Sequence, residues 1–161
     1  MKVIVAVENS QYSHDMVGEL TKRRWPKDTA FKILTVLPPI DRQVHGHDHT
    51  VHVYCAMQDQ RRHEAESTGS AFRKILMEGI AYSSVHFEVR EGCPKTEIVQ
   101  AAAEWGADKI ILGANTGLPT QSKTHGRVCK GVVYHAGCAV EVVVPHQARN
   151  AKKEQALVAG A

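Results

Sequence analysis

The sequence predicts a doubly wound α/β fold, in which a five-stranded parallel sheet has helices on both faces. Three observations predict it. Short runs of β-branched and apolar residues recur along the chain, as in parallel strands that are buried on both faces. Segments with helical spacing alternate with these runs, and this alternation requires parallel pairing through right-handed crossovers. The 161 residues, 43% hydrophobic and 23% charged, suffice for one globular domain with its own core.

Five segments carry the strand pattern. Four are short runs dominated by Val, Ile and Leu, and the third in chain order alternates apolar and polar residues. Pro38 stops the second run, and Pro145 stops the last. The expected strands are Val3–Val7, Phe31–Leu37, Val85–Val89, Lys109–Leu112 and Ala139–Val144.

Apolar residues at helical spacing fall between these strands. Ser10 or Ser13 is expected to cap the first helix, Pro94 suits the first position of the third, and Gly106 ends the third. The second is expected to be one long amphipathic helix from about Gln58 to Ile80. The apolar stripes are Met16, Val17 and Leu20; Ala65, Phe72, Ile75, Leu76 and Ile80; Ile98, Ala102 and Trp105; and Val128, Val132, Val133 and Ala136.

Residues 40–56 are polar and rich in histidine, and we expect them to form a loop. His45, His47, His49 and His52, with Asp48, are a dense group of potential metal ligands. Three interpretations remain open: a flexible loop with incidental histidines, a weak metal site, or a segment that covers the edge where a ligand binds. A structural zinc site needs four well-placed ligands on a rigid frame, so we assign no metal ligand here.

Ligands of doubly wound sheets bind outside the carboxyl ends of the strands. Three segments reach that edge: Glu8–Ser10, the residues after Leu37, and residues 113–129, GANTGLPTQSKTHGRVC. The last segment begins with glycine after a buried strand, as phosphate-binding loops do, but it lacks the Gly-Lys-Ser/Thr of a P-loop. Cys129 is near a predicted helix start, where a thiol could either have a lowered pKa or replace a packed serine.

Charge, hydrophobic run length and cysteine content bear on three properties: nucleic-acid binding, membrane association and cellular compartment. The net charge of +3 is small, and the basic clusters Lys22–Arg24 and Arg61–Arg62 have no interleaved aromatic stripe, so we expect no nucleic-acid partner. The N-terminal run VIVAV is far shorter than a signal peptide or a membrane segment, so we expect no membrane association. None of the four cysteines belongs to a C-x-x-C pair, which predicts reduced thiols and a cytoplasmic protein.

Three motifs occur in order: KVIVAVENSQYS, REGCPKTEIVQAAAEWGADKIILGAN and HAGCAVEVVVP. They resemble the first strand and turn, the "V-x-G-x-P … I … A … A-D-x-I-x-x-G" segment, and the closing strand of the universal stress protein family. The resemblance covers residues 1–145 and implies a Rossmann-like fold of the adenine nucleotide alpha hydrolase-like type. Residues 146–161, rich in Ala, Lys and Gln, are then expected to be a flexible C-terminal tail.

Members of that family that bind ATP carry a glycine, two residues, a glycine, nine residues, and then a glycine with Ser/Thr. The glycines let backbone N–H groups approach phosphates at a helix N-terminus. This chain keeps the first and third glycines as Gly113 and Gly126. Thr116 replaces the second glycine, and Arg127 and Cys129 replace the two hydroxyl positions.

The resemblance implies ATP or another adenine nucleotide, accompanied by Mg²⁺ or Mn²⁺. Glu8 takes the place of an aspartate that approaches the ribose and adenine in ATP-binding members. Backbone groups of the glycine-containing loop would hold the phosphates. The implied binding residues are Val7, Glu8, Val36, Gly113, Thr116, Gly126, Arg127, Val128 and Cys129.

Two functions remain open. The first is a stress-response module that binds an adenine nucleotide at the carboxyl edge of the sheet. The second is a nucleotide-free, homodimeric protein-interaction module, because Thr116 and Arg127 depart from the ATP-binding pattern. The resemblance implies a homodimer through the apolar last strand, Ala139–Val144, and leaves other protein partners unknown. No Ser-His-Asp or Cys-His-Asn arrangement predicts an enzyme, so we expect at most slow ATP hydrolysis.

Overall fold

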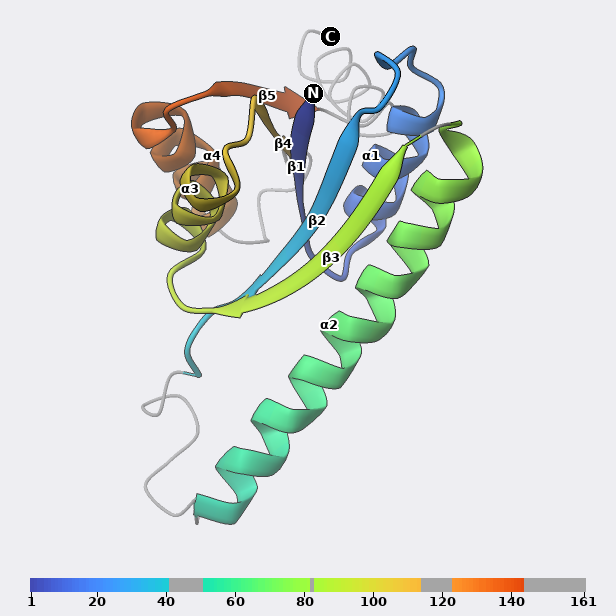
Figure 1. Cartoon of the computed structure of the whole chain (residues 1–161). Coiled ribbons are helices and arrows are strands. Elements are labelled where there is room, and N and C mark those ends of the chain that lie inside the picture. The colour runs from blue at the N-terminus through green and yellow to red at the C-terminus, as the bar shows by residue number, and fades with distance from the viewer. Residues whose placement is uncertain (41–50, 82, 114–122, 144–161) are drawn as a thin grey trace, which may run out of the picture.

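The computed structural model describes residues 1–40, 51–81, 83–113 and 123–143. In these segments five strands form one sheet, and four helices cover it (Figure 1). The elements confirm the predicted doubly wound α/β fold. They are β1 (Lys2–Val7), α1 (Gln11–Thr21), β2 (Ala30–Leu37), α2 (Val51–Gly79), β3 (Ser84–Glu91), α3 (Pro94–Trp105), β4 (Lys109–Gly113), α4 (Lys123–His135) and β5 (Ala139–Val143).

The strand order is β3-β2-β1-β4-β5, so the direction of winding reverses at β1. β1 pairs in parallel with β2 on one side and with β4 on the other, so that Val5 lies between Ile33 and Ile111. Because the connections after β1 and β4 leave toward opposite faces, a crevice forms between the carboxyl ends of these two strands. This switch point is where we look for a ligand site.

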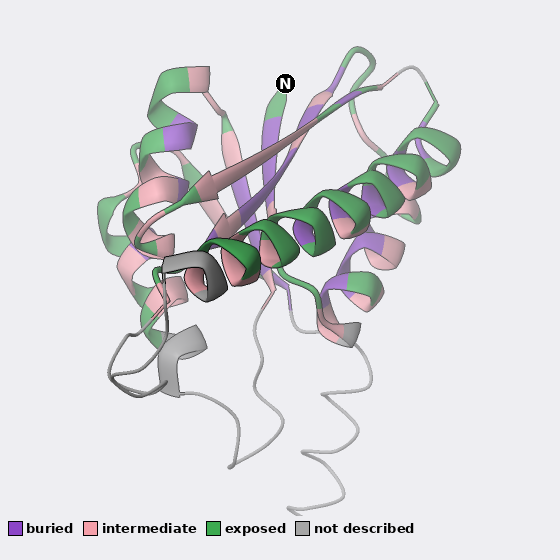
Figure 2. Cartoon of the chain, turned by 90° about the horizontal axis from the view of Figure 1, so that it is seen from below, coloured by how far each residue is buried: buried purple, intermediate pink, exposed green. Residues whose placement is uncertain are grey.

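The helices form two layers. α1 and α2 cover one face of the sheet, and α3 and α4 cover the other (Figure 1). Alternate residues of each strand therefore enter two separate cores, which the purple ribbon of Figure 2 marks on the strands and on the inner sides of the helices. The first core holds Val3, Val5, Val7, Met16, Val17, Leu20, Phe31, Ile33, Phe72, Leu76, Ile80, Val85, Ile111 and Val143, and the second holds Ile4, Leu34, Ile98, Ala101, Ala102, Ile110, Leu112 and Val132.

The predicted helix caps are present. Ser10 is the N-cap of α1, and its hydroxyl accepts the Ser13 N–H at 3.3 Å. α3 begins at Pro94 and ends at Gly106, whose φ of 64° lies in the left-handed region that favours glycine. These caps fix the N-termini of α1 and α3 at the carboxyl edge of the sheet.

α2 begins at Val51, so our expectation of a loop through residue 56 is wrong for residues 51–56. Tyr54 and Met57 are half-buried at helical spacing, so the inner face of the helix continues past the predicted start at Gln58. The N-terminal end of α2 extends beyond the sheet (Figure 1). His52 belongs to its first turn, and the other histidines of the group, His45 to His49, lie outside the described residues.

Side chains tie this end of α2 to the strands. The Arg61 guanidinium donates to the Pro38 carbonyl at 2.9 Å, just after β2. Gln58 and Arg62 both donate to the Glu91 carboxylate at the end of β3. These contacts explain how a polar segment stays helical beyond the apolar core.

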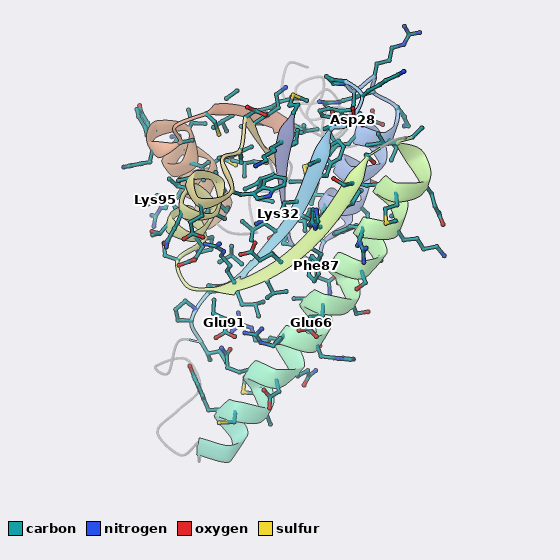
Figure 3. The ribbon with its side chains drawn as sticks, in the orientation of Figure 1. Asp28, Lys32, Glu66, Phe87, Glu91 and Lys95 are labelled. Carbon is teal, nitrogen blue, oxygen red and sulfur yellow. The ribbon has the colours of Figure 1, made fainter. Side chains whose placement is uncertain are left out.

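Between α3 and the strands β2 and β3, charged side chains occupy positions where apolar core residues would be expected. The Lys32 ammonium contacts Glu88 at 2.7 Å and lies 5.1 Å from the Trp105 ring centroid, on the side of the sheet toward α3 (Figure 3). Arg90 binds Glu88 and also reaches the first and last turns of α3, at Glu97 (3.7 Å) and Glu104 (2.6 Å). Partial burial by itself would raise the pKa of Glu88, but the hydrogen bonds from Lys32 and Arg90 outweigh it and lower that pKa.

A second charged group lies at the opposite corner of the sheet. Glu141 of β5 binds Arg23 at the end of α1 and Lys109 of β4, the latter at 3.2 Å. Burial would raise the pKa of Glu141, but the hydrogen bonds from Arg23 and Lys109 lower it overall. The two cations therefore favour the ionised form of this carboxylate.

We expect Gly69→Ala to destabilise the fold. Phe87 of β3 points toward α2 (Figure 3), and a Cβ on Gly69 would lie 1.9 Å from its ring. The Phe87 ring or the helix would have to move away, at a cost of about 1–3 kcal/mol in the free energy of unfolding. Gly18→Ala is the matched control, because an added Cβ there meets nothing within 4 Å, and helix propensity should then raise stability by up to about 1 kcal/mol. Urea denaturation measures both; equal effects would contradict the close packing.

We expect Arg90→Gln to destabilise the protein at pH 7, by on the order of 1 kcal/mol, because Glu88 loses a partner. The pKa of Glu88 is depressed in the folded state, so this stabilisation is present above its ordinary value of 4.5 and is lost as pH falls through the folded value. The gap between variant and wild type in urea denaturation should therefore narrow below that pH. Lys74→Gln, in a solvent-exposed pair, is the control and should show little change at any pH.

Candidate functional site

A cavity of about 350 Å³ opens at the switch point of the sheet. Its size is within the range of small-molecule sites. Residues from the ends of β1, β2 and β4 and from α1, α3 and α4 form its walls. They are Ala6, Val7, Glu8, Tyr12, Ser13, Leu34, Val36, Pro38, Pro94, Ile98, Leu112, Gly113, Val128 and Cys129.

The turn after β1 places a carboxylate at this cavity. The Glu8 N–H donates to the Ser13 hydroxyl at 3.0 Å, and the Glu8 carbonyl accepts the Ser10 N–H at 2.9 Å. These bonds fix Glu8 between the end of β1 and the capped start of α1. Tyr12, in the first turn of α1, lines the same side.

Cys129 joins α4 to the end of β4. Its thiol lies 3.7 Å from the Gly113 carbonyl, at hydrogen-bond distance for sulfur. Burial raises the pKa of Cys129 and outweighs a backbone hydrogen bond that lowers it, and the charge of Glu8 adds a smaller increase. The thiol therefore has the environment of a packed side chain and not that of a thiolate nucleophile.

The structure brings six of the predicted binding residues together: Val7, Glu8, Val36, Gly113, Val128 and Cys129 all line the cavity. Thr116 lies outside the described residues. Gly126 and Arg127 are in α4, which begins at Lys123, earlier than the sequence pattern predicted. Arg127 is exposed and is not among the cavity's described lining.

The early start of α4 changes which of its backbone groups are available. Only the first four N–H groups of a helix lack an intrahelical partner. In α4 these include residues 123–125, whereas the N–H groups of Gly126, Arg127, Val128 and Cys129 are in position to bond one turn back. An anion at this helix would therefore meet N–H groups of the first turn, before Gly126.

The N-termini of α1, α3 and α4 all lie at the carboxyl edge, where the helix dipoles favour negative charge. At α3, the favourable environment for negative charge affects the thiol of Cys93, the exposed N-cap residue. The nearby backbone N–H of Thr96, with smaller contributions from the Thr96 hydroxyl and from Lys95, lowers the pKa of the Cys93 thiol. The edge thus combines an apolar wall, one carboxylate and helix ends suited to anions.

Sequence reasoning missed several lining residues. Leu34 shares a strand face with Val36, so strand alternation could have identified it. Tyr12, Pro94 and Ile98 come from helices whose placement over the crevice follows only from the complete topology. Among the residues that the structure describes, no group of three or more His, Cys, Asp and Glu side chains is suited to a metal ion.

The family model described as the universal stress protein family matches residues 1–144. The chain therefore belongs to this family, as the sequence motifs predicted. No curated protein matches the sequence. Within the described segments, no helix is both long and apolar enough to span a membrane.

Solved structures support the fold. A hypothetical protein whose biochemical function was assigned from its structure matches with a TM-score of 0.71 at 21% identity, over 89% of this chain and 94% of that one. An Arabidopsis thaliana universal stress protein family protein with AMP bound has a TM-score of 0.63 at 19% identity, over 91% and 92%. The Archaeoglobus fulgidus universal stress protein in complex with dAMP has a TM-score of 0.57 at 23% identity, over 88% and 96%.

We expect Cys93 to react with iodoacetamide much faster than Cys129 at pH 7. Cys93 is exposed with a lowered pKa, whereas Cys129 is half-buried with a raised pKa. Time-resolved alkylation followed by peptide mass spectrometry measures both rates in one sample. Labelling in denaturant is the control and should remove the difference. Equal rates in the folded protein would show that Cys129 is not enclosed as described.

Proposed function

We propose that this chain binds an adenine nucleotide in the cavity at the carboxyl edge of its sheet and works as a stress-response module. The observation that carries the proposal is the convergence of six predicted binding residues on one cavity at the switch point. Apolar residues of β2, α3 and α4 (Val36, Ile98 and Val128) give a surface on which a base can pack.

The ribose, the adenine amino group and the phosphates of the nucleotide would each have hydrogen-bond partners in the cavity. Glu8 would accept hydrogen bonds from ribose hydroxyls or from the adenine amino group. The first turn of α4 would place backbone N–H groups near a phosphate. The AMP and dAMP named for two structural neighbours support an adenine nucleotide as the ligand class.

The described lining of the cavity offers few ligands for a divalent metal ion. Glu8 is the only carboxylate among the described lining residues, so the protein there does not offer the several oxygen ligands of a dedicated metal site. Mg²⁺ or Mn²⁺ would instead arrive on the phosphates of the nucleotide. We expect hydrolysis, if any, below about 1 per second, since no histidine is among the described lining residues.

A second candidate function, homodimerisation through the last strand, is favoured by one observation. β5 ends the sheet, and Val142 on it is 40% exposed. Unpaired main-chain groups beside an exposed apolar side chain favour pairing with another strand. We propose a homodimer through Ala139–Val143; Val144, the last residue of the predicted strand, lies outside the described residues.

Calorimetric titration with adenosine, AMP, ADP and ATP, with and without Mg²⁺, tests nucleotide binding. We expect micromolar affinity for at least one adenine nucleotide, and at least a tenfold loss in Val36→Phe, because the larger ring fills space that the base would occupy. Met77→Phe is the control, since Met77 is 52% exposed on α2 and should bind like wild type. The absence of heat with every nucleotide at millimolar concentration would rule out the proposed ligand class.

A further inference from the structure

Arg90 of β3 lies next to the cavity without belonging to its described lining. In the register of the sheet, Arg90 is the neighbour of Val36 on β2, and Glu88 is the neighbour of Leu34. Leu34 and Val36 both line the cavity, and paired residues of neighbouring strands share a face of the sheet. The charged side chains of β3 therefore border the cavity on the face that α3 covers.

α3 supplies part of the cavity wall, through Pro94 and Ile98. The buried residues of this helix are Ile98, Ala101 and Ala102, so two of the three have only a methyl side chain. Small residues let a helix lie close to a sheet, but a methyl group makes few contacts that would resist sliding. Apolar packing therefore fixes the position of α3 only weakly.

The guanidinium of Arg90 supplies a stronger constraint. Its Nε donates to Glu88 of the same strand, its Nη1 lies 3.7 Å from the Glu97 carboxylate, and its Nη2 donates to Glu104 at 2.6 Å. Glu97 and Glu104 are seven residues apart, so they lie on one face of α3 about two turns from each other. Each nitrogen of the planar fork has a different carboxylate, and one rigid group thus connects β3 to the first and last turns of α3.

The turn that leads into α3 holds one of these carboxylates from the other side. It contains Gly92, whose φ of 148° lies in the region that favours glycine. A Cβ on Gly92 would lie 2.7 Å from Oε1 of Glu97. The Glu97 carboxylate therefore lies against both this turn and Arg90, close to the point where Pro94 begins the cavity wall.

We propose that Arg90 is a positioning residue for the nucleotide cavity, because it holds α3 at a fixed distance from β2 and β3. The inference rests on the proposed binding of an adenine nucleotide, and it names a residue outside the described lining on which the affinity depends. A base that packs between Val36 of β2 and Ile98 of α3 makes close contact with both only while their spacing is kept.

The charges around Arg90 would oppose this spacing if the guanidinium were absent. Glu88 on the strand would then face Glu97 and Glu104 on the helix without the cation that the three carboxylates share. Like charges that lose a common partner repel each other. Removal of Arg90 should therefore push α3 away from β3, and the cavity should widen on the α3 side.

Calorimetric titration of the full chain with AMP and with ATP tests the assignment. We expect Arg90→Gln to weaken the tighter of the two about three- to tenfold. A modest loss of stability leaves nearly every molecule folded, so the effect of this variant on folding does not account for such a change in affinity. Arg90→Lys should lose nearly as much affinity, since one ammonium group cannot reach carboxylates at both ends of α3.

Two control variants disturb the other face of the sheet. Glu91 follows Arg90 in β3, faces the opposite side and binds Arg62 of α2, so Glu91→Gln should bind nucleotide like wild type. Gly69→Ala disturbs the packing of α2 on β3 and should lower the stability without changing the affinity. Urea denaturation of the same samples measures the stability of each variant, which separates lost stability from lost positioning.

Hydrogen–deuterium exchange of the nucleotide-free protein reports on α3 independently. The amides of residues 93–105 should exchange faster in Arg90→Gln than in wild type, and Glu91→Gln should leave them unchanged. A wild type that binds neither nucleotide would contradict the proposed function, and the exchange rates would still decide whether Arg90 holds α3. Unchanged exchange in Arg90→Gln, wild-type affinity in Arg90→Gln or Arg90→Lys, or an equal loss of affinity in Glu91→Gln or Gly69→Ala would each overturn the assignment.

Discussion

The rest of the structure depends on the position of β1 in the centre of a parallel sheet. Val3, Ile4 and Val5 are fully buried because helices cover both faces, which only crossover connections can supply. The same connections make the winding reverse at β1, so the chain departs in two directions from neighbouring strand ends. The cavity is thus a consequence of burying β1, and its lining comes from six elements because all of them start or end there.

The helices contact the strands unevenly, since α1 and α2 pack mainly on β2, β3 and β4, whereas α3 and α4 pack mainly on β2 and β5. Charged side chains lie at one corner of the sheet on each face. Lys32, Glu88 and Arg90 fill the corner next to β3, and Glu141 with its two cations fills the corner next to β5. Partly buried charges require such pairing, because an isolated ion there would lose its hydration.

The strands could be predicted because burial on both faces requires uninterrupted apolar runs such as Val3–Val7. The start of α4 could not be predicted, because the polar residues before Val128 show no periodicity. The start of α2 was expected too late, because Tyr54 and Met57, although at helical spacing, follow a histidine-rich polar segment. Val133 was expected in the core, but consecutive residues of a helix point 100° apart, and Val132 already faces inward. The cavity residues after β1 and β4 followed from strand ends, whereas Tyr12 and Pro94 required knowledge of where the helices start in space.

The contact between Gly131 and Lys95 has a mechanical consequence for the cavity. A Cβ on Gly131 would lie 2.4 Å from the Lys95 side chain, so α3 and α4 touch closely at this point. Both helices also contribute cavity wall, through Pro94 and Val128. Helices packed this tightly shift together more easily than they separate. The wall should therefore move as one rigid plate, and the cavity would widen by tilting that plate against the sheet.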